Sequence, residues 1–192
     1  MKKKNSDEKL LKMPLIKEKD ISYDFIENYI FTKEQEWAKE SISHLEKEQL
    51  PEDKYSESII EGKLSLKKLD HPFYDTIVLS EGNIKGEFQV PCSRCLLPAD
   101  QKFDLSFSSA FVSESFEKNE ELEDMTFLHD TTQYELFFMD KKKQLNLALM
   151  VQEQLGINLE PFPLHSPDCK GLCSQCGTNL NTESCKHHPQ EQ

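Results

Sequence analysis

The chain has 192 residues, which is enough for one full domain with either an appendage or a long N-terminal extension. Its formal net charge is −12, from 35 acidic and 23 basic residues, so the surface as a whole repels polyanions. This charge excludes a protein that binds nucleic acid over its whole surface and leaves only local contacts. Every basic residue except Arg94 is a lysine. A single guanidinium is a poor basis for recognising bases or phosphates through bidentate hydrogen bonds.

The N-terminal residues MKKK resemble the basic start of a signal peptide, but Lys9 and Lys12 interrupt the apolar region that should follow. No apolar window is as long as a membrane span, and the best of them runs from Leu145 to Val151. We therefore expect a cytoplasmic protein without a membrane partner. In a reducing compartment six cysteines favour metal binding, whereas three disulfides would be the alternative in a secreted chain.

The N-terminal region is predicted to contain one helix. Three features are expected in order: a solvated lysine-rich tail over residues 1–12, a short strand within residues 13–30 and a helix over about 33–50. Thr32 and Gln35 have the spacing of a capping box before that helix, and Pro51 ends it. Trp37 lies on the apolar side of the helix. We expect this ring to be a packing anchor rather than a stacking platform for bases.

The middle of the chain changes to the alternating pattern that is typical of strands. The predicted strands span residues 60–66, 73–79, 84–90 and 103–112, with turns at residues 70–72 and 81–83. Strands so close in sequence, with short turns, predict an antiparallel meander. Cys92 and Cys95 follow the third of these strands. They would lie at the end of a hairpin, where metal ligands are easily presented.

The last third of the sequence begins with an acidic stretch, residues 113–124, that has no apolar period and is expected to be a flexible loop. A strand is predicted over residues 134–139. A helix is predicted over about 144–156, because leucines recur there on one broad apolar face and Gly156 is in a helix-stop position. Pro161 and Pro163 then lead into a segment rich in cysteine.

Together these elements predict an α+β fold. Its core would be an antiparallel β meander, or barrel-like, with an N-terminal helix, a later helix and a C-terminal Cys-rich zinc-binding segment. We expect three parts: a 1–54 N-terminal extension, a 55–164 antiparallel sheet domain that includes the later helix, and a 165–188 Cys/His metal-binding segment packed on the sheet domain.

The segment from His165 to His188 contains four of the six cysteines and three of the six histidines. It has too few apolar residues to order itself by burying hydrocarbon, so something other than a core must hold it. Cys173-x2-Cys176 followed by Gly177 is typical of a zinc knuckle, in which two thiolates on a tight turn reach one tetrahedral ion. The glycine accepts the backbone twist after the second ligand.

Eight residues are candidate metal ligands: Cys92, Cys95, His165, Cys169, Cys173, Cys176, Cys185 and His187. Eight ligands fill two tetrahedral sites, so we expect one or two zinc ions. The preferred partition puts the last four in one site and the first four in another. The alternative joins the two Cys-x2-Cys turns in one site, as in a zinc ribbon. His188 competes with His187 as the terminal ligand, and cysteines without any metal are the remaining reading.

Sites filled by thiolates and imidazoles are structural rather than catalytic, because no position remains open for water. The chain has no His-Glu-x-x-His motif, no nucleotide-binding glycine loop and no serine elbow. We therefore expect neither enzymatic activity nor a small-molecule substrate. A thiol oxidoreductase is the less favoured alternative for Cys92 and Cys95, because a thioredoxin-type pair opens a helix, and Pro98 with the strand pattern after it argues against one.

The chain resembles the YceD family, the large ribosomal RNA subunit accumulation proteins of bacteria and plastids. The matching pieces are Cys92-x-Arg94-Cys95-Leu96, the leucine-rich helix before a proline segment, and Cys169-Lys170-Gly171-Leu172-Cys173-x2-Cys176-Gly177-x-Asn179-Leu180-Asn181 ending in Cys185-x-His187. In this order they span roughly residues 56–188. His165 and His187 stand where a cysteine is often found in the family, and this exchange preserves the number of ligands.

The resemblance implies a non-enzymatic role in the accumulation, processing or stability of 23S rRNA, and hence in large ribosomal subunit biogenesis. The implied partner is 23S rRNA, a large-subunit ribosomal protein or an assembly intermediate. We hypothesise that the metal brings Arg94 and Lys170 together as the contact surface, while the acidic body limits non-specific binding. The alternative is a zinc-stabilised protein-interaction adaptor that does not contact RNA.

Overall fold

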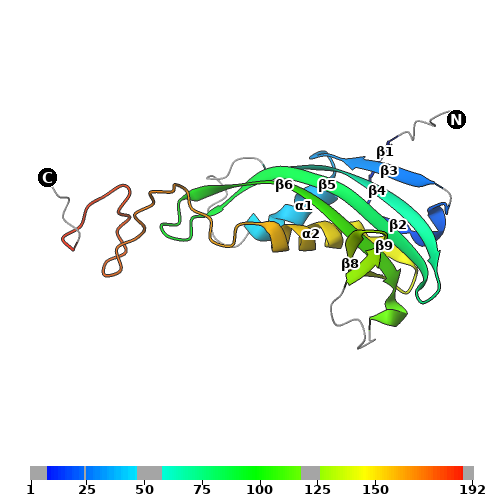
Figure 1. The fold of residues 1–192 in the computed structure, drawn as a ribbon. Coiled ribbons are helices and arrows are strands. Elements are labelled where there is room, and N and C mark those ends of the chain that lie inside the picture. The colour runs from blue at the N-terminus through cyan, green and yellow to red at the C-terminus, as the bar shows by residue number, and fades with distance from the viewer. Residues whose placement is uncertain (1–7, 24, 47–57, 118–125, 188–192) are drawn as a thin grey trace.

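The computed structural model describes residues 8–23, 25–46, 58–117 and 126–187. Its strands are β1 (Lys9–Leu10), β2 (Leu15–Lys17), β3 (Ile26–Phe31), β4 (Ile59–His71), β5 (Asp75–Pro91), β6 (Pro98–Ser113), β7 (Thr126–His129), β8 (Thr132–Met139) and β9 (Gln144–Asn146). Its helices are α1 (Glu36–Glu46) and α2 (Leu147–Asn158), with 3-10 turns η1 (Glu18–Asp20) and η3 (Glu114–Phe116). The fold is therefore α+β, with one large sheet and two helices (Figure 1).

The large sheet has seven strands in the order β1-β3-β4-β5-β6-β8-β7. Strands β3 to β6 pair antiparallel in chain order, as the predicted meander requires. The sheet as a whole is mixed, because β1 pairs parallel with β3 and β6 pairs parallel with β8. Parallel neighbours need a long crossover, and residues 114–131 supply one between β6 and β8. Among the described strands β1 and β7 are the two edges, so the barrel-like core predicted from the sequence is wrong: the sheet stays open.

Strand β5 is continuous from Asp75 to Pro91, so the turn predicted at residues 81–83 is wrong. Gly82 is paired with Leu64 on one side and Phe107 on the other. A Cβ atom at this position would lie 2.4 Å from the carbonyl oxygen of Lys63 and 2.8 Å from Cζ of Phe107. Here glycine marks a close approach of an aromatic ring and a neighbouring strand, which is its other role within sheets. Gly86 likewise lies in close contact with the ring of Phe103 and with a neighbouring strand.

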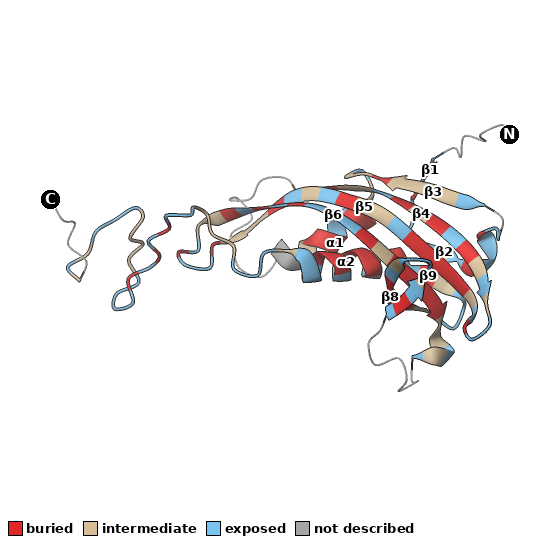
Figure 2. Ribbon diagram, viewed as in Figure 1, coloured by how far each residue is buried: buried red, intermediate tan, exposed pale blue. Residues whose placement is uncertain are grey.

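The main core lies between the sheet and the two helices, which cover the same face (Figures 1 and 2). Trp37 of α1 is buried against Phe31 of β3, with ring centroids 4.8 Å apart, and its indole N–H donates to the carbonyl oxygen of Leu11 at 3.2 Å. The predicted packing role of this ring is therefore confirmed. Before α1, the Gln35 Oε1 atom accepts from the backbone N–H of Thr32 at 2.7 Å, as a capping box requires. The predicted continuation of this helix to about residue 50 lies outside the described residues.

The start of the described chain is not a solvated tail. Lys9 and Leu10 pair with β3, and the side chain of Leu11 is buried in the main core, so the sequence-based expectation for residues 8–12 is wrong. Residues 1–7 lie outside the described ranges. The later helix also begins later than expected, because residues 144–146 form β9 and pair with β2. Helix α2 starts where Asn146 Oδ1 accepts from the N–H of Leu149 at 3.1 Å.

The acidic stretch after β6 is described only in part. Its first residues form η3, and residues 118–125, which carry most of the predicted loop, lie outside the described ranges, as do residues 51–54. Within the described ranges neither helix has the length and apolar composition needed to cross a membrane.

Candidate metal centre

The longest hairpin of the sheet presents the first pair of cysteines. Strands β5 and β6 pair as far as Pro91 and Pro98, so Cys92 and Cys95 lie in the loop at its end, as predicted. This loop is closed by a hydrogen bond from the N–H of Cys92 to the carbonyl oxygen of Leu97 at 2.8 Å. The hairpin extends beyond the helices towards the C-terminal arm, which we define as residues 165–187 (Figure 1).

The arm and the proline segment directly before it are attached to the hairpin loop by backbone hydrogen bonds. The N–H of Ser93 donates to the carbonyl oxygen of Pro163 at 2.9 Å, and the N–H of Leu172 donates to the carbonyl oxygen of Arg94 at 3.1 Å. Gly171 lies beside Arg94 and has φ +77°, a left-handed conformation that favours glycine. These contacts bring together parts of the chain that are far apart in sequence.

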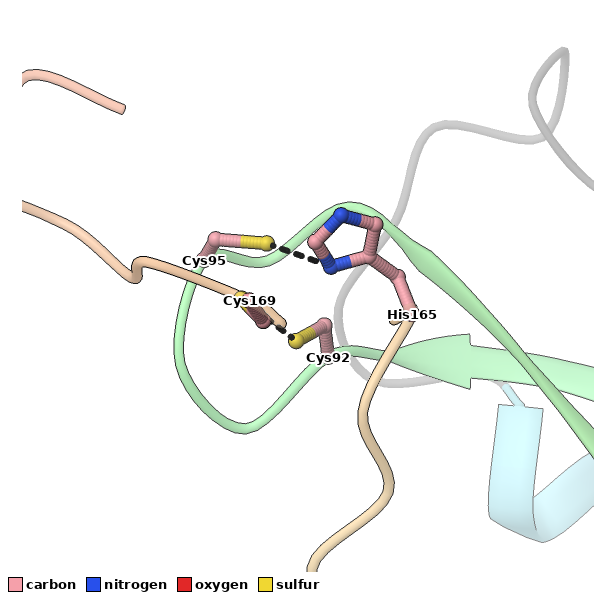
Figure 3. Close-up of side chains that lie close together, drawn as sticks. All are labelled: Cys92, Cys95, His165 and Cys169. Atoms are coloured by element: carbon pink, nitrogen blue, oxygen red, sulfur yellow. Dashed lines mark hydrogen bonds between the residues drawn. The ribbon is translucent and has the colours of Figure 1, made fainter. Parts of the chain in front are cut away.

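The first ligand group is Cys92, Cys95, His165 and Cys169, and its ligand atoms lie within 4.8 Å of one another (Figure 3). The Sγ atoms of Cys92 and Cys169 are 3.7 Å apart, too far for a disulfide. Two sulfur ligands of a tetrahedral zinc ion, each about 2.3 Å from the metal, are about 3.8 Å apart. The imidazole Nδ1 of His165 lies 3.2 Å from Sγ of Cys95. The three cysteines are at most 5% exposed, so the sulfur ligands are shielded from water, whereas His165 is partly exposed.

The second ligand group is Cys173, Cys176, Cys185 and His187, again within 4.8 Å of one another. Nδ1 of His187 lies 3.9 Å from Sγ of Cys173 and 4.0 Å from Sγ of Cys185. The turn that carries the first two thiols is closed by the N–H of Gly177, which donates to the carbonyl oxygen of Cys173 at 2.8 Å. Only Cys173 of this group is buried, whereas Cys176 is exposed.

The surroundings of the first group lower the pKa of one thiol and raise that of another. Burial raises the pKa of the Cys92 thiol, but backbone hydrogen bonds from His165 and Arg94 outweigh it and lower that pKa to about 5. Burial, together with the neighbouring thiols of Cys169 and Cys92, raises the pKa of Cys95 to about 11. A cation placed among these thiols would offset the rise in pKa that the neighbouring thiols cause, since it attracts each thiolate.

In the second group the exposed thiol of Cys176 has a lowered pKa. A hydrogen bond with the hydroxyl of Thr178, whose oxygen lies 3.2 Å from Sγ of Cys176, lowers the pKa of this thiol to about 6. A thiol that is already deprotonated near neutral pH is ready to bind a metal ion.

All eight candidate ligands therefore lie in two groups, and these are the two sets of the preferred partition. The two Cys-x2-Cys turns belong to different groups, so the zinc-ribbon pairing of these turns is not what the chain adopts. His188 lies outside the described residues. The chain continues from Cys95 into strand β6, without the helix that a thioredoxin-type pair would open.

Four further residues of interest lie beside the first ligand group: Arg94 and Lys170, which were predicted as a contact surface, and Asn179 and Asn181, which were not predicted. Arg94 is exposed, and its Nη1 atom donates to the carbonyl oxygen of Cys169 at 3.2 Å, directly before the exposed Lys170. Asn181 and Asn179 contact the first ligand group, a role that the sequence analysis missed. Both asparagines lie in the stretch that carries the family resemblance, but asparagine between Cys176 and Cys185 is equally typical of a turn and does not by itself indicate this contact.

Open α+β architecture and two groups of thiol and imidazole ligands at one end of the sheet define a protein with candidate structural metal sites. A family model described as "Large ribosomal RNA subunit accumulation protein YceD" matches residues 80–192, more than half of the chain and all eight candidate ligands. The chain belongs to the YceD family.

Two curated relatives extend this finding. An uncharacterized protein of Mycobacterium tuberculosis is 28% identical over 116 residues, which are 59% of this chain and 50% of the relative. A maize (Zea mays) protein named "Large ribosomal RNA subunit accumulation protein YCED homolog 1, chloroplastic" is 26% identical over 121 residues, 54% of this chain and 41% of the relative. The chain thus spans about half the length of the curated relatives it matches. No solved structure matches it.

Proposed function

We propose that this protein supports the accumulation of 23S rRNA, through its processing or stability, during large ribosomal subunit biogenesis in the cytoplasm. The observation that carries the proposal is membership of the YceD family over the region that holds the long hairpin, α2 and both ligand groups. In this proposal the protein acts by binding, without a reaction of its own and without a small-molecule substrate. Its partner is 23S rRNA or a protein or intermediate of large-subunit assembly.

We also propose that each ligand group holds one structural zinc ion. The support is the donor set, three thiols and one imidazole in each group, with separations close to those of a tetrahedral site. Zinc would supply the folding energy that the arm lacks, since its residues bury little hydrocarbon outside the cysteines. The bound ion would also fix the arm to the hairpin loop, because the first group takes two ligands from each.

The proposed contact surface consists of Arg94 and Lys170. The hydrogen bond from the Arg94 guanidinium to the carbonyl oxygen of Cys169 supports it, because this bond holds the arginine next to Lys170. Both residues are exposed and carry positive charge at a point where phosphate groups could approach. The net charge of −12 elsewhere would keep non-specific binding of RNA weak.

The test is charge reversal at the proposed surface, Arg94→Glu with Lys170→Glu, measured as association with large-subunit assembly intermediates over a range of salt concentrations. If both residues contact phosphates, association weakens and the slope of log K against log salt falls by roughly two in magnitude. The matched control is Lys19→Glu with Lys142→Glu. It makes the same change of charge at exposed residues of η1 and of the turn between β8 and β9, outside the proposed contact surface. Unchanged association of the first variant, with its zinc content intact, contradicts the proposed surface.

A zinc-stabilised adaptor that binds protein rather than RNA is the second candidate, and the acidity of the chain favours it. A tetrahedral site of three thiolates, one imidazole and Zn²⁺ carries a net charge of −1, so filling both sites adds no positive charge that would attract RNA. Binding to a large-subunit protein that is insensitive to salt, without protection of rRNA, would establish the adaptor. Strong salt dependence with protection of rRNA would exclude it.

A further inference from the structure

The loop that closes the second ligand group reaches across to the first. This loop, residues 177–184, runs between the ligands Cys176 and Cys185. In it, the side-chain amide of Asn181 donates from Nδ2 to Sγ of Cys169 at 3.6 Å, and Oδ1 of the same amide accepts from the N–H of Lys170 at 2.8 Å. One asparagine of the second group's loop therefore contacts both the sulfur and the following backbone amide of a first-group ligand.

Asn179 holds Asn181 in this position and contacts the other side of the first group. Oδ1 of Asn179 accepts from Nδ2 of Asn181 at 2.8 Å and from its backbone N–H at 3.0 Å. Nδ2 of Asn179 points to the carbonyl oxygen of Cys95 at 3.5 Å. The two asparagines thus bridge Cys95 of the hairpin loop and Cys169 of the arm, one from each half of the first group.

Backbone contacts also join this loop to residues 171–172, which lie close to Cys169 in the chain. Leu172 and Asn179 form an antiparallel β-bridge, and the N–H of Leu180 donates to the carbonyl oxygen of Gly171 at 3.0 Å. The ligands Cys176 and Cys185 of the second group flank the loop directly. An ion that closed this group around a common centre would therefore hold both ends of the loop.

We propose that the two metal sites form one coupled unit, in which an ion in the second group holds residues 177–184 so that Asn181, supported by Asn179, positions Cys169 as a ligand of the first. This inference rests on the proposed zinc sites. A hydrogen bond donated to a metal-bound thiolate fixes the direction of its lone pairs, and loss of such an outer contact typically costs about 10- to 100-fold in metal affinity. Asn181 is a positioning residue, since it contacts a ligand and not the metal.

The second ion should be lost before the first, because the two groups differ in exposure. All three cysteines of the first group are buried, whereas Cys176 of the second is exposed and Cys185 is partly exposed. Solvent and chelators reach the second ion first, and its loss frees the loop and withdraws Asn181 from Cys169. By thermodynamic reciprocity, an empty first group lowers the affinity of the second by the same factor.

The test measures the zinc affinity of the first group in the full chain, by competition with a chromophoric chelator, and its coordination by the charge-transfer spectrum after cobalt substitution. Emptying the second group with Cys176→Ser and Cys185→Ser should weaken the first by roughly 10- to 100-fold. Asn181→Ala should weaken the first group by a similar factor while both ions can still bind. Ser184→Ala, an exposed change in the same loop, is the matched control and should leave both affinities unchanged.

A double-mutant cycle identifies the route of the coupling. With Asn181→Ala already present, emptying the second group should add little further loss at the first, because the same contact has been removed. Full and additive losses would overturn the role of Asn181. A first site whose affinity does not respond to emptying the second overturns the coupling alone and leaves the proposed zinc sites intact. A wild-type chain that binds no zinc overturns both.

Discussion

A methyl group has no room at Gly82. The Cβ atom would lie 2.4 Å from a backbone oxygen of β4, which cannot move without disturbing the ladder, and 2.8 Å from the ring of Phe107. We expect Gly82→Ala to lower the free energy of unfolding by about 1–3 kcal/mol, the usual cost of overpacking. Urea denaturation followed by circular dichroism measures the change.

The matched control is Gly156→Ala, the same chemical change in α2, where a Cβ atom would meet no atom within 4 Å. Alanine is favoured over glycine in a helix by about 0.5–1 kcal/mol, so this variant should be more stable than the wild type. The two variants should shift the urea midpoint in opposite directions, and a shift of the same sign would contradict the packing described around Gly82.

At the scale of elements, one carboxylate joins the first strand to the sheet. Glu27 of β3 accepts from Lys9 of β1 at 2.7 Å, from the hydroxyl of Tyr29 at 2.8 Å and from the N–H of Ser22 at 3.3 Å. Burial raises the pKa of Glu27, but these hydrogen bonds outweigh it and hold the pKa below its usual value. Burial and, after it, the contact with Glu27 raise the pKa of the Tyr29 hydroxyl.

A depressed carboxyl pKa stabilises the fold above the unfolded value and loses this effect as the pH falls through the folded value. Glu27→Gln should therefore be less stable than the wild type by about 1–2 kcal/mol at pH 7, with the difference shrinking below about pH 4.5. Glu61→Gln, at an exposed pair with Lys85, is the control and should leave stability nearly unchanged, because solvent screens this pair. A Glu27→Gln deficit that persists unchanged at low pH would argue against the ionised contact.

The elements that the sequence predicts well are those decided by neighbours in the chain. The hairpin end at Cys92 and Cys95 follows from two alternating runs with a short loop between them. Gly82 could not be assigned from sequence, since glycine marks a turn as often as a close approach to a ring. The parallel pairings of β1 and β8 depend on long-range contacts, which leave no local pattern.

At the scale of the whole molecule, the arm and the sheet are held by different interactions. The first ligand group packs with Ala99, apart from the main core between the sheet and helices. At saturating zinc, elemental analysis should find two ions per chain, and one after Cys92→Ser with Cys95→Ser. In that variant trypsin should cleave faster at the arm residues Lys170 and Lys186, while thermal unfolding of the sheet stays nearly unchanged.

Ser93→Ala, between the two cysteines, is the control for this experiment and should keep both ions. One ion in the wild type, unaffected by the double change, would confine the metal to the second group and make the thiols of the hairpin free to react. No zinc in the wild type would remove the metal sites from the proposal.

The eight candidate ligands and their preferred division into two groups could be predicted from sequence, but not the contacts that hold the two groups together. Three thiols and one imidazole per group follow from the composition of residues 92–95 and 165–187. The roles of Asn179 and Asn181 could not be predicted, because they depend on how the loop folds back on Cys169. The division into residues 1–54, 55–164 and 165–188 stays a prediction, although β3 of the first part pairs with β4 of the second.

The separation of the first-group ligands along the chain sets the order in which the protein can be completed during its own synthesis. Cys92 and Cys169 are 77 residues apart. At a translation rate of about 5–20 residues per second, the hairpin thiols wait roughly 4–15 s for the other two ligands to be added. A nascent chain that stops before residue 165 has the hairpin but neither partner for it. Under the proposed zinc sites, this group can close around an ion only after the chain has been extended past Cys169.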